Sequence, residues 1–481
     1  MPQFLDLMPI MPEILLTTLA LLLLLADAIL KKRGAGAIGG LSIFGLLSTI
    51  IGVYYLYDNK MPVIFSGMFS ADNFSLFFKF IFLISAILTI LISFKYIKVR
   101  DINIGEYYIL ILFATIGMMI MASGTDLISI YVSLELMAMS TYILAGIERQ
   151  RATSNESAMK YFILGAFSSA LLLYGISFVY GITGTTNLEK VAAYLSNTPE
   201  NNMAVVLSLI LLVSAFAFKI AAVPFHMWTP DVYQGAPTPI TGFMSAGSKA
   251  AGFAVLLRFL FTGMPSLQNE WITIIIVLSI LTMTVGNIAA IVQTNIKRML
   301  AFSSIAHAGY LLIAVVTVSD IGLSSILLYL LIYAFMNMGA FGVVSMVQKK
   351  TGEGGQIDDY KGLAKVYPFG AFMMLLFLFS LTGIPPTAGF IGKFYIFAAA
   401  VKKDLIELAV IGVINSAISA YYYLRVIMYM YMKEPEEDVV LEKSAAMTAA
   451  LVISAVFVLS FIIYSEPVVN NITKAVSGLI R

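Results

Sequence analysis

Four charged side chains lie in the middle of long apolar segments, where an isolated charge is out of place. They are Glu135, Lys219, Lys249 and Lys393. A charge at the depth of a bilayer is costly, so an ionisable residue there is a functional hypothesis by default. A long side chain near the end of a segment can extend its head group to the surface, but Glu135 and Lys219 lie too deep for that. The other interpretation is a buried ion pair kept only for assembly.

Prolines interrupt the chain close to two of these lysines. Lys219 precedes Pro224, and Lys393 follows Pro385 and Pro386. Proline removes a helix hydrogen bond and clashes with the preceding turn, so both helices are expected to break there. Irregular backbone at membrane depth is tolerated only where protein or a water-filled cavity satisfies it. A broken helix that carries a lysine therefore indicates an ion path.

The chemistry that these residues offer is proton transfer. Glu135, Lys219, Lys249, His307 and Lys393 form a set of acids and bases without a nucleophile, a phosphate loop or a metal cluster. Burial disfavours a charged amine and a nearby carboxylate favours it, so movement of Glu135 relative to Lys219 would switch that lysine between loading and release. A lone histidine such as His307 is also often a satisfied core residue. Three hydroxyl groups are candidates to carry water chains between the members: Ser245, Ser248 and Tyr395.

Composition excludes most other classes of function. The chain has no cysteine and two histidines, His226 and His307, which excludes iron–sulfur ligation and thiol catalysis and leaves a dedicated zinc site improbable. The formal net charge is +2, so the chain lacks the strong positive charge that is typical of proteins that bind nucleic acid. We therefore expect no cofactor and no metal on this chain.

The elements that position these residues are membrane-spanning helices. Of the 481 residues, 60% are hydrophobic and 12% are charged, whereas a soluble domain carries about 25% charge. The fold predicted is an all-α polytopic membrane protein with about fourteen transmembrane helices. The expected spans are 10–30, 37–57, 74–95, 106–123, 125–147, 158–181, 203–222, 240–262, 272–294, 299–318, 322–347, 367–385 continuing to about 400, 405–431 and 444–465.

The loop cations predict the orientation, because short cytoplasmic loops are enriched in Lys and Arg. With the N-terminus outside, most loop cations fall on the cytoplasmic side, so both termini are expected to face away from the cytoplasm. The stretches 349–365 and 433–443 are expected to be solvated loops on that side. No signal peptide pattern precedes the first span. Three further cations lie near span ends, where extension to the surface would explain them: Lys79, Arg258 and Arg425.

The two expected breaks suggest an internal repeat. The proline follows the lysine in one span and precedes it in the other, five spans later, which is the pattern of an inverted-topology repeat with two discontinuous helices. The chain is then a single membrane domain, 1–481, with two inverted five-helix repeats. Its parts are 1–100 with helices 1–3, 104–262 with helices 4–8, 270–431 with helices 9–13, and 444–481 with the final helix and tail.

Three sequence motifs carry a family resemblance. They are KIAAVPFHMWTPDVYQGAPTP at 219–239, NIKRMLAFSSIAHAGY at 295–310 and GIPPTAGFIGKF at 383–394. The chain resembles the antiporter-like membrane subunits of respiratory complex I, the proton-pumping NADH-quinone oxidoreductase, and of multi-subunit cation/proton antiporters. Within this group it is most similar to the subunit N family, because position 393 is a lysine and the chain ends soon after the last span.

The resemblance implies roles for the deep charges. It implies that Glu135 and Lys219 form the ion pair of the input half, that Lys249 is the central relay, and that Lys393 lies toward the exit half. His307 matches a position between the halves. The function implied is proton translocation coupled to electron transfer from NADH to quinone, in the cell inner (plasma) membrane. Other membrane subunits and a peripheral arm would hold FMN, iron–sulfur clusters and the quinone site.

Other functions remain open from the sequence. The main alternative is a subunit of a multi-subunit Na+/H+ antiporter, for which the same proton path would serve. A stand-alone transporter would need a midplane pocket with substrate-selective groups, and no such solute site is apparent. A purely structural subunit is disfavoured by the four deep charges and the two broken helices.

Overall fold

The protein is a bundle of long apolar helices. The computed structural model describes residues 4–30, 34–59, 61–102, 104–197, 203–349, 355–435, 439–461 and 463–477. In these residues twelve helices are long and apolar enough to cross a membrane. The two other predicted spans are an interrupted pair, α16 and α17, and the shorter α19, which meets α20 at 88°. The all-α polytopic prediction is confirmed, while residues 31–33, between the first two predicted spans, lie outside the described residues.

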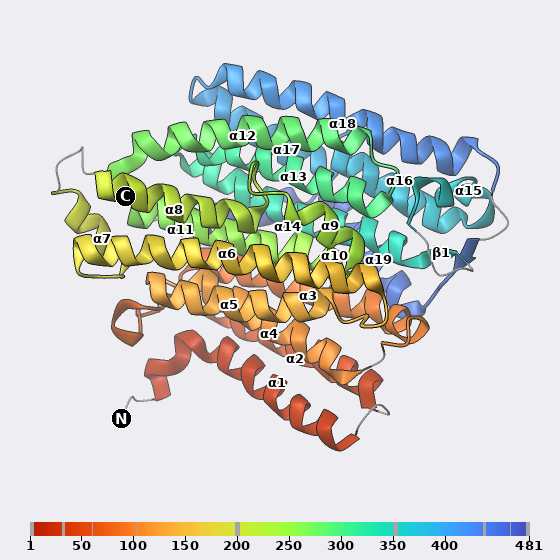
Figure 1. The fold of residues 1–481 in the computed structure, drawn as a ribbon, viewed down its shortest axis with the longest axis horizontal. Helices are drawn as coiled ribbons and strands as arrows, with labels where there is room; N and C mark the ends of the chain where they lie inside the picture. Colours follow the sequence, from red (N-terminus) through yellow and green to blue (C-terminus); the bar gives the residue numbers. More distant parts are fainter. Residues whose placement is uncertain are drawn as a thin grey trace.

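The helices up to residue 432 follow the chain from one side of the bundle to the other, and the helices after residue 444 return to its middle (Figure 1). The N-terminal group is η1 Phe4–Ile10, α1 Met11–Leu30, α2 Ala35–Leu56, η3 Phe65–Gly67 and α3 Asn73–Val99. The next group is α4 Gly105–Ser123, α5 Leu127–Ala145, α6 Ala152–Thr183, α7 Leu188–Leu195, α8 Met203–Ile220, α9 Trp228–Gly235, α10 Thr238–Phe243, the π-helix η4 Met244–Ser248, α11 Lys249–Arg258 and the π-helix η5 Phe259–Gly263.

The second half repeats this succession of long helices. It comprises η6 Pro265–Leu267, α12 Gln268–Ile291, α13 Ile296–Val315, α14 Asp320–Met346, η7 Ile357–Tyr360, α15 Leu363–Val366, α16 Pro368–Thr382, α17 Ala388–Lys402 and α18 Ile406–Met432. The chain closes with α19 Ala445–Ser460 and α20 Ser465–Val476. Two three-residue strands, β1 Val347–Lys349 and β2 Val439–Leu441, pair antiparallel, so the two segments predicted as solvated loops meet at one point.

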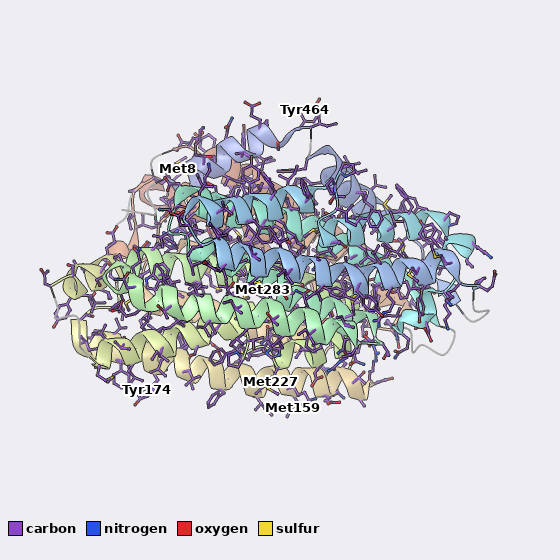
Figure 2. All side chains as sticks on the ribbon, turned by 90° about the horizontal axis from the view of Figure 1, so that it is seen from above. Met8, Met159, Tyr174, Met227, Met283 and Tyr464 are labelled. Atoms are coloured by element: carbon purple, nitrogen blue, oxygen red, sulfur yellow. The ribbon has the colours of Figure 1, made fainter. Side chains whose placement is uncertain are left out.

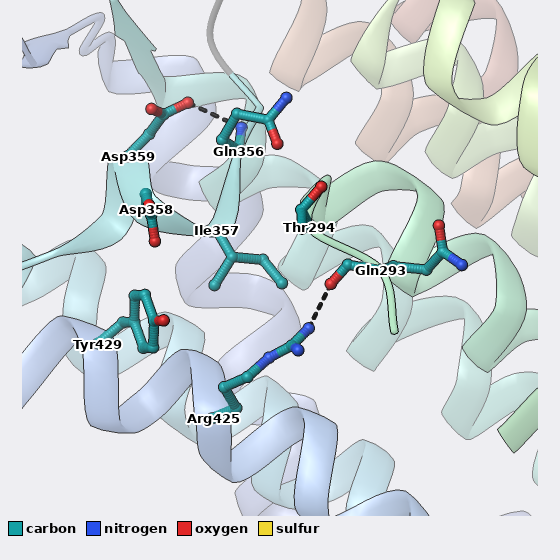
Figure 3. Close-up of a pocket in the computed structure, with 8 residues that line it drawn as sticks. All are labelled: Gln293, Thr294, Gln356, Ile357, Asp358, Asp359, Arg425 and Tyr429. Atoms are coloured by element: carbon teal, nitrogen blue, oxygen red, sulfur yellow. Dashed lines mark hydrogen bonds between the residues drawn. The ribbon is translucent and has the colours of Figure 1, made fainter. Parts of the chain in front are cut away.

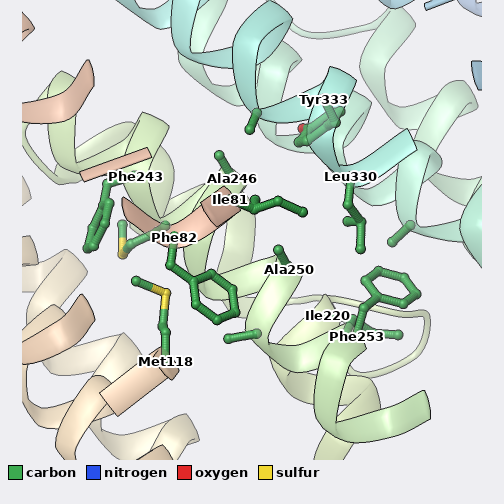
Figure 4. Close-up of a cluster of buried hydrophobic side chains, with 14 of the residues drawn as sticks. Ile81, Phe82, Met118, Ile220, Phe243, Ala246, Ala250, Phe253, Leu330 and Tyr333 are labelled. Carbon is green, nitrogen blue, oxygen red and sulfur yellow. The ribbon is translucent and has the colours of Figure 1, made fainter. Parts of the chain in front are cut away.

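The centre of the bundle is formed by the helices that carry the candidate site. α13, α14 and the segment from α10 to η5 are almost entirely buried. Apolar side chains of α3, α4 and α14 pack around η4 and α11 (Figure 4), with Phe82, Ala250 and Leu330 among them. Lys249 begins α11, so this packing places a lysine in the best-buried part of the chain.

Apolar side chains also cover the sides of the bundle. Met159, Tyr174 and Met227 lie at its margin in Figure 2, and each is more than half exposed in this chain. Such a surface needs lipid or other membrane subunits around it. The charged loops lie at the ends of the helices instead.

We call one end of the bundle the basic end, because it gathers Arg151, Lys297, Arg298, Lys361 and Lys365. These residues lie at the start of α6 and α13 and around η7 and α15, on the side of β1 in Figure 1. The other end, where α3 and α14 begin, is called the opposite end. There Lys474 of α20 pairs with Asp58, which follows α2.

Both helix breaks occur where prolines predicted them, and they have the same local geometry. The amide of Ala222 donates to the carbonyl of Ala217 at 2.8 Å, and the amide of Ile384 donates to Phe379 at 3.0 Å. The residue before each donor has a positive φ, 61° at Ala221 and 86° at Gly383. Both breaks thus end a helix in the same way, with a residue in the left-handed region.

The two segments predicted as five-helix repeats, 104–262 and 270–431, also contain matching backbone bridges. Asp126 caps α5 and bridges Asn187, while Asn295 caps α13 and bridges Gln356. Each bridge lies between the helix N-terminus and the segment that follows the next long helix. The number of residues from Asp126 to Asn295 equals the number from Asn187 to Gln356.

Two close contacts at glycines match in the same way, because the same number of residues along the chain separates them. A methyl group at Gly117 of α4 would lie 2.7 Å from the backbone nitrogen of Met137, and one at Gly286 of α12 would lie 2.7 Å from that of Ala306. These glycines let α4 pack closely on α5 and α12 on α13. The two helix pairs therefore share one packing geometry.

Two of the three cations predicted to reach the surface are buried instead. Lys79 pairs with Glu13 of α1 at 2.7 Å, with both side chains almost fully buried. Arg258 is 3% exposed and binds Asp72. The surface interpretation was wrong for both, because an acid on a distant helix supplies the counter-charge, and sequence spacing does not reveal that acid. The third, Arg425, is half-buried and donates to backbone carbonyls of α12 and the turn after it.

The Lys79–Glu13 pair yields a stability prediction. Lys79→Ala would leave Glu13 buried without its counter-charge, so we expect a loss of about 3–5 kcal/mol in the free energy of unfolding. The double variant Lys79→Met with Glu13→Leu should recover most of that loss, because it removes both charges. Denaturant titration of the purified protein in detergent measures the difference. Equal stability of the Lys79→Ala protein and the parent would contradict the prediction.

Candidate functional site

The first part of the site lies between α5, α6 and α8. Glu135 of α5 accepts a hydrogen bond from the hydroxyl of Ser169 on α6. Lys219, 6% exposed, lies near the end of α8 with its Nζ 5.9 Å from the ring centroid of Tyr142 and 5.7 Å from that of Phe218. This Nζ has no hydrogen-bond partner among the described residues. The ammonium is therefore held by aromatic faces and is not in direct contact with Glu135.

The centre of the site lies where α11 meets α13. Lys249 is 3% exposed and donates to the backbone carbonyl of Ser304 at 2.6 Å and also to its hydroxyl. The Ser304 hydroxyl lies 3.2 Å from that of Ser245, which in turn lies 3.1 Å from the hydroxyl of Tyr333. The π-helix η4 directly precedes Lys249, and such local widenings of a helix are frequent at functional sites.

His307 lies one helical turn beyond Ser304 on α13. Its Nδ1 is 2.6 Å from the hydroxyl of Tyr329, and its Nε2 is 3.1 Å from that of Tyr423. Tyr423 also hydrogen-bonds Ser303. Both ring nitrogens therefore have partners that can donate or accept, so the imidazole can exchange a proton on either side.

The last part of the site lies at the break between α16 and α17. Lys393, 4% exposed, donates to the carbonyl of Thr382 at 2.9 Å and to the hydroxyl of Ser416 at 2.9 Å. Its Nζ lies 4.9 Å from the ring centroid of Tyr310. A methyl group at Gly383 would lie 3.0 Å from Cδ of Lys393. Glycine at the break thus leaves room for the lysine side chain.

The structure places the predicted residues along one row. A methyl group at Gly252 of α11 would lie 2.9 Å from Ile220 and 3.4 Å from Cβ of Lys219, so α8 and α11 are in contact beside both lysines. α13 then carries Ser304 and His307 on one face, and Tyr310 of the same helix reaches Lys393. The row crosses α8, α11, α13 and α17 in the interior of the bundle.

Sequence reasoning missed most of the hydroxyl partners. Ser245 lies in the row as expected, whereas Ser248 has no hydrogen-bond partner among the described residues and Tyr395 is 38% exposed, packed on Phe394. The hydroxyls that contact the relay come from Ser169, Ser304, Tyr329, Tyr423 and Ser416. Ser and Tyr are common in membrane helices, so only their placement in space distinguishes these residues.

Comparison with known proteins identifies the family. The family model described as "NADH:quinone oxidoreductase/Mrp antiporter, TM" matches residues 124–419. NADH-quinone oxidoreductase subunit N of Trichlorobacter lovleyi is 49% identical over 455 residues, which cover 94% of this chain and 93% of the relative. The chain belongs to the subunit N family of NADH-quinone oxidoreductase. Subunit N of Parvibaculum lavamentivorans is 41% identical over 482 residues, covering 100% of this chain and 98% of the relative.

Chains of solved membrane complexes share this fold. A chain of respiratory complex I from Thermus thermophilus is 32% identical with a TM-score of 0.82, covering 96% of this chain and 99% of that one. A chain of the Mrp complex from Dietzia sp. has the same TM-score at 20% identity, covering 100% and 98%. The Mrp likeness shows a shared fold alone. In the described residues of this subunit N family member, no group of three or more acidic or histidine side chains could hold a metal.

Proposed function

We propose that this chain is the proton-translocating membrane subunit of an NADH-quinone oxidoreductase, with Glu135, Lys219, Lys249, His307 and Lys393 as its proton relay. One observation carries the proposal. Three buried lysines and a histidine lie along one row through the bundle, each from a different helix or turn, and hydroxyl groups contact most of them. A row of buried acids and bases in contact with hydroxyl groups suits protons better than a solute.

The contacts suggest a separate role in proton transfer for each residue of the row. Lys249 and Lys393 each donate to a backbone carbonyl and a hydroxyl, which stabilise an ammonium. Nζ of Lys219 lies near two aromatic rings and has no hydrogen-bond partner among the described residues, so its charge depends on how close Glu135 comes. Approach of Glu135 would load Lys219, and its retreat toward Ser169 would release a proton to Lys249. His307 then connects Lys249 with the half that contains Lys393.

We also propose that 104–262 and 270–431 are inverted repeats. The matched breaks, the matched bridges of Asp126 and Asn295, and the matched glycine contacts support this division of the chain. In an inverted repeat, equivalent residues lie at opposite depths. Lys219 before one break and Lys393 after the other then sit near the middle of the membrane.

The surroundings of the chain follow from the same proposal. The basic end would face the cytoplasm and both termini would face the other side of the cell inner (plasma) membrane. Other membrane subunits would cover the exposed apolar faces, and partner subunits of the peripheral arm would hold FMN, iron–sulfur clusters and the quinone site. The main alternative, a subunit of a Na+/H+ antiporter, predicts a purified native complex without flavin and iron–sulfur absorbance.

Lys249→Arg tests whether the central lysine moves protons or only carries charge. Arginine stays protonated in proteins, so we expect proton translocation by the assembled, reconstituted complex to fall at least about tenfold. The same change at Lys365, an exposed lysine paired with Glu434, is the matched control and should have no effect. Normal pumping by the Lys249→Arg complex would show that Lys249 is structural and would remove the centre of the relay.

A further inference from the structure

Two arginines occupy matched places in the two five-helix units. Arg258 is the last residue of α11, and its Nε and Nη2 donate to the carbonyl of Ala122, at 3.2 and 2.9 Å. Arg425 of α18 donates through Nη1 to the carbonyl of Ile291 at 2.8 Å. Ala122 lies in the last turn of α4, and Ile291 ends α12. The number of residues from Ala122 to Ile291 equals the number that separates the two bridges and the two glycine contacts. The arginines thus make the same contact in each unit.

The matched arginines lie at opposite ends of the bundle. Arg258 binds Asp72, which caps the start of α3 at the opposite end. Arg425 lies at the basic end, where its Nη2 also donates to the carbonyl of Gln293 in the turn after α12 (Figure 3). The guanidinium groups of Arg258 and Arg425 therefore lie near different faces of the membrane.

A cavity at the basic end has Arg425 in its lining. It has a volume of about 250 Å³, and Gln293, Gln356, Asp358 and Asp359 line it together with Ile357 and Tyr429 (Figure 3). Its polar groups can hold water. The next inward-facing residue of α18, one helical turn deeper, is the fully buried Tyr422.

A column of hydrogen bonds runs inward from Tyr422 to Tyr310. The hydroxyl of Tyr422 donates to the amide oxygen of Asn287 at 3.0 Å, and the amide nitrogen of Asn287 donates to the hydroxyl of Tyr310 at 2.9 Å. The ring of Tyr310 faces Nζ of Lys393. Arg425 at the head of the column keeps its proton, and a fixed positive charge in a pore excludes protons and cations.

Arg258 occupies the matched place in the first unit, with a carboxylate as its partner. Its Nη1 and Nη2 donate to the two carboxylate oxygens of Asp72 at 2.8 and 2.9 Å, and its guanidinium lies 5.0 Å from the ring centroid of Phe74. Burial raises the pKa of the Asp72 carboxyl, but Arg258 and Ser75 together hold it below its ordinary value. Asp72 therefore stays ionised and keeps Arg258 in place.

We propose that Arg258, paired with Asp72, and Arg425 are matched plugs that close the two units at opposite ends. The unit with Lys219 is then accessible only from the basic end, and the unit with Lys393 only from the opposite end. A proton can cross only through the central row, which makes transport directional. This inference rests on the proposed function of the row.

A passive leak assay tests the plugs. The complex is reconstituted in liposomes that contain a pH-sensitive dye, and a potassium diffusion potential is applied without NADH. We expect Arg425→Gln to leak protons about tenfold faster than the parent, and Arg425→Lys to leak much less. Arg258→Gln combined with Asp72→Asn should leak in the same way. Arg149→Gln, an exposed arginine at the basic end, is the matched control.

A second change in each leaking complex shows which path the leak takes. Lys393→Met should suppress the leak of Arg425→Gln, and Lys219→Met that of the Arg258 variant, because each plug guards one lysine. Asn287→Leu added to Arg425→Gln should also lower the leak, because it removes the hydrogen bonds that join Tyr422 to Tyr310. The proposed plug role would be wrong if Arg425→Gln caused no leak, or if adding Lys393→Met left that leak unchanged. Normal pumping by Lys393→Met alone would instead overturn the relay.

Discussion

Replacement of Lys219 by alanine is expected to lower proton translocation by at least about a hundredfold, the contribution of a positioned proton-transfer group. The chain should still insert and assemble, because the change removes a buried charge whose Nζ has no hydrogen-bond partner in the described residues. The apolar neighbours Tyr142 and Phe218 would line the space that the side chain leaves. Proton pumping by the reconstituted complex, normalised to its content of assembled subunits, measures the effect.

The controls separate proton transfer from folding. Lys190→Ala removes an exposed lysine from α7 and should leave pumping unchanged. Glu135→Gln keeps the hydrogen bond from Ser169 but removes the charge that acts on Lys219, so we expect an intermediate loss. Near-normal pumping by Lys219→Ala would mean that the aromatic cage around this lysine serves only packing, and the input half of the relay would have to be reassigned.

The deep charges were predictable from sequence because the membrane makes them conspicuous. A lysine such as Lys249 among small apolar residues has no ordinary explanation at that depth. Prolines likewise located both breaks, since they remove a hydrogen bond wherever they stand in a helix. Fold class and broken helices therefore followed from local chemistry alone.

What the sequence could not provide is which residues meet across helices. The resemblance implied an ion pair between Glu135 and Lys219, whereas the structure holds Glu135 on Ser169 and surrounds Lys219 with aromatic rings. Lys79 looked like a surface residue because its partner, Glu13, lies on a helix far away in the chain. Partners of this kind depend on tertiary packing, which no periodicity encodes.

The helix that follows α6 illustrates a second limit. α7 is short and amphipathic, with Leu188, Val191 and Leu195 buried, and it lies in a stretch that hydropathy assigns to a loop. The π-helix η4 was equally invisible, because its composition is that of the surrounding span. Both features depend on how neighbouring helices pack, yet η4 lies directly before the central lysine of the proposed relay.

Lys393 offers the sharpest test of chemistry against packing. We expect Lys393→Met to lower pumping at least about a hundredfold, because methionine fills similar space but cannot carry a proton. Lys393→Glu should retain pumping within about tenfold of the parent, since a protonated carboxyl can donate to Thr382 and an ionised one can accept from Ser416. The ring of Tyr310 would lose its cation in both variants, so that contact cannot explain a difference between them.

The comparison is made on the assembled complex at equal subunit content, with pumping and NADH oxidation measured together. Thermal unfolding of both variants checks that the break at Gly383 is intact, because the Lys393 side chain lies against it. If both variants lose pumping equally while remaining folded, the ammonium itself is required and Lys393 is an electrostatic element. If Lys393→Glu pumps and Lys393→Met does not, the residue exchanges protons. Either a lysine or a glutamate at this position then supports pumping.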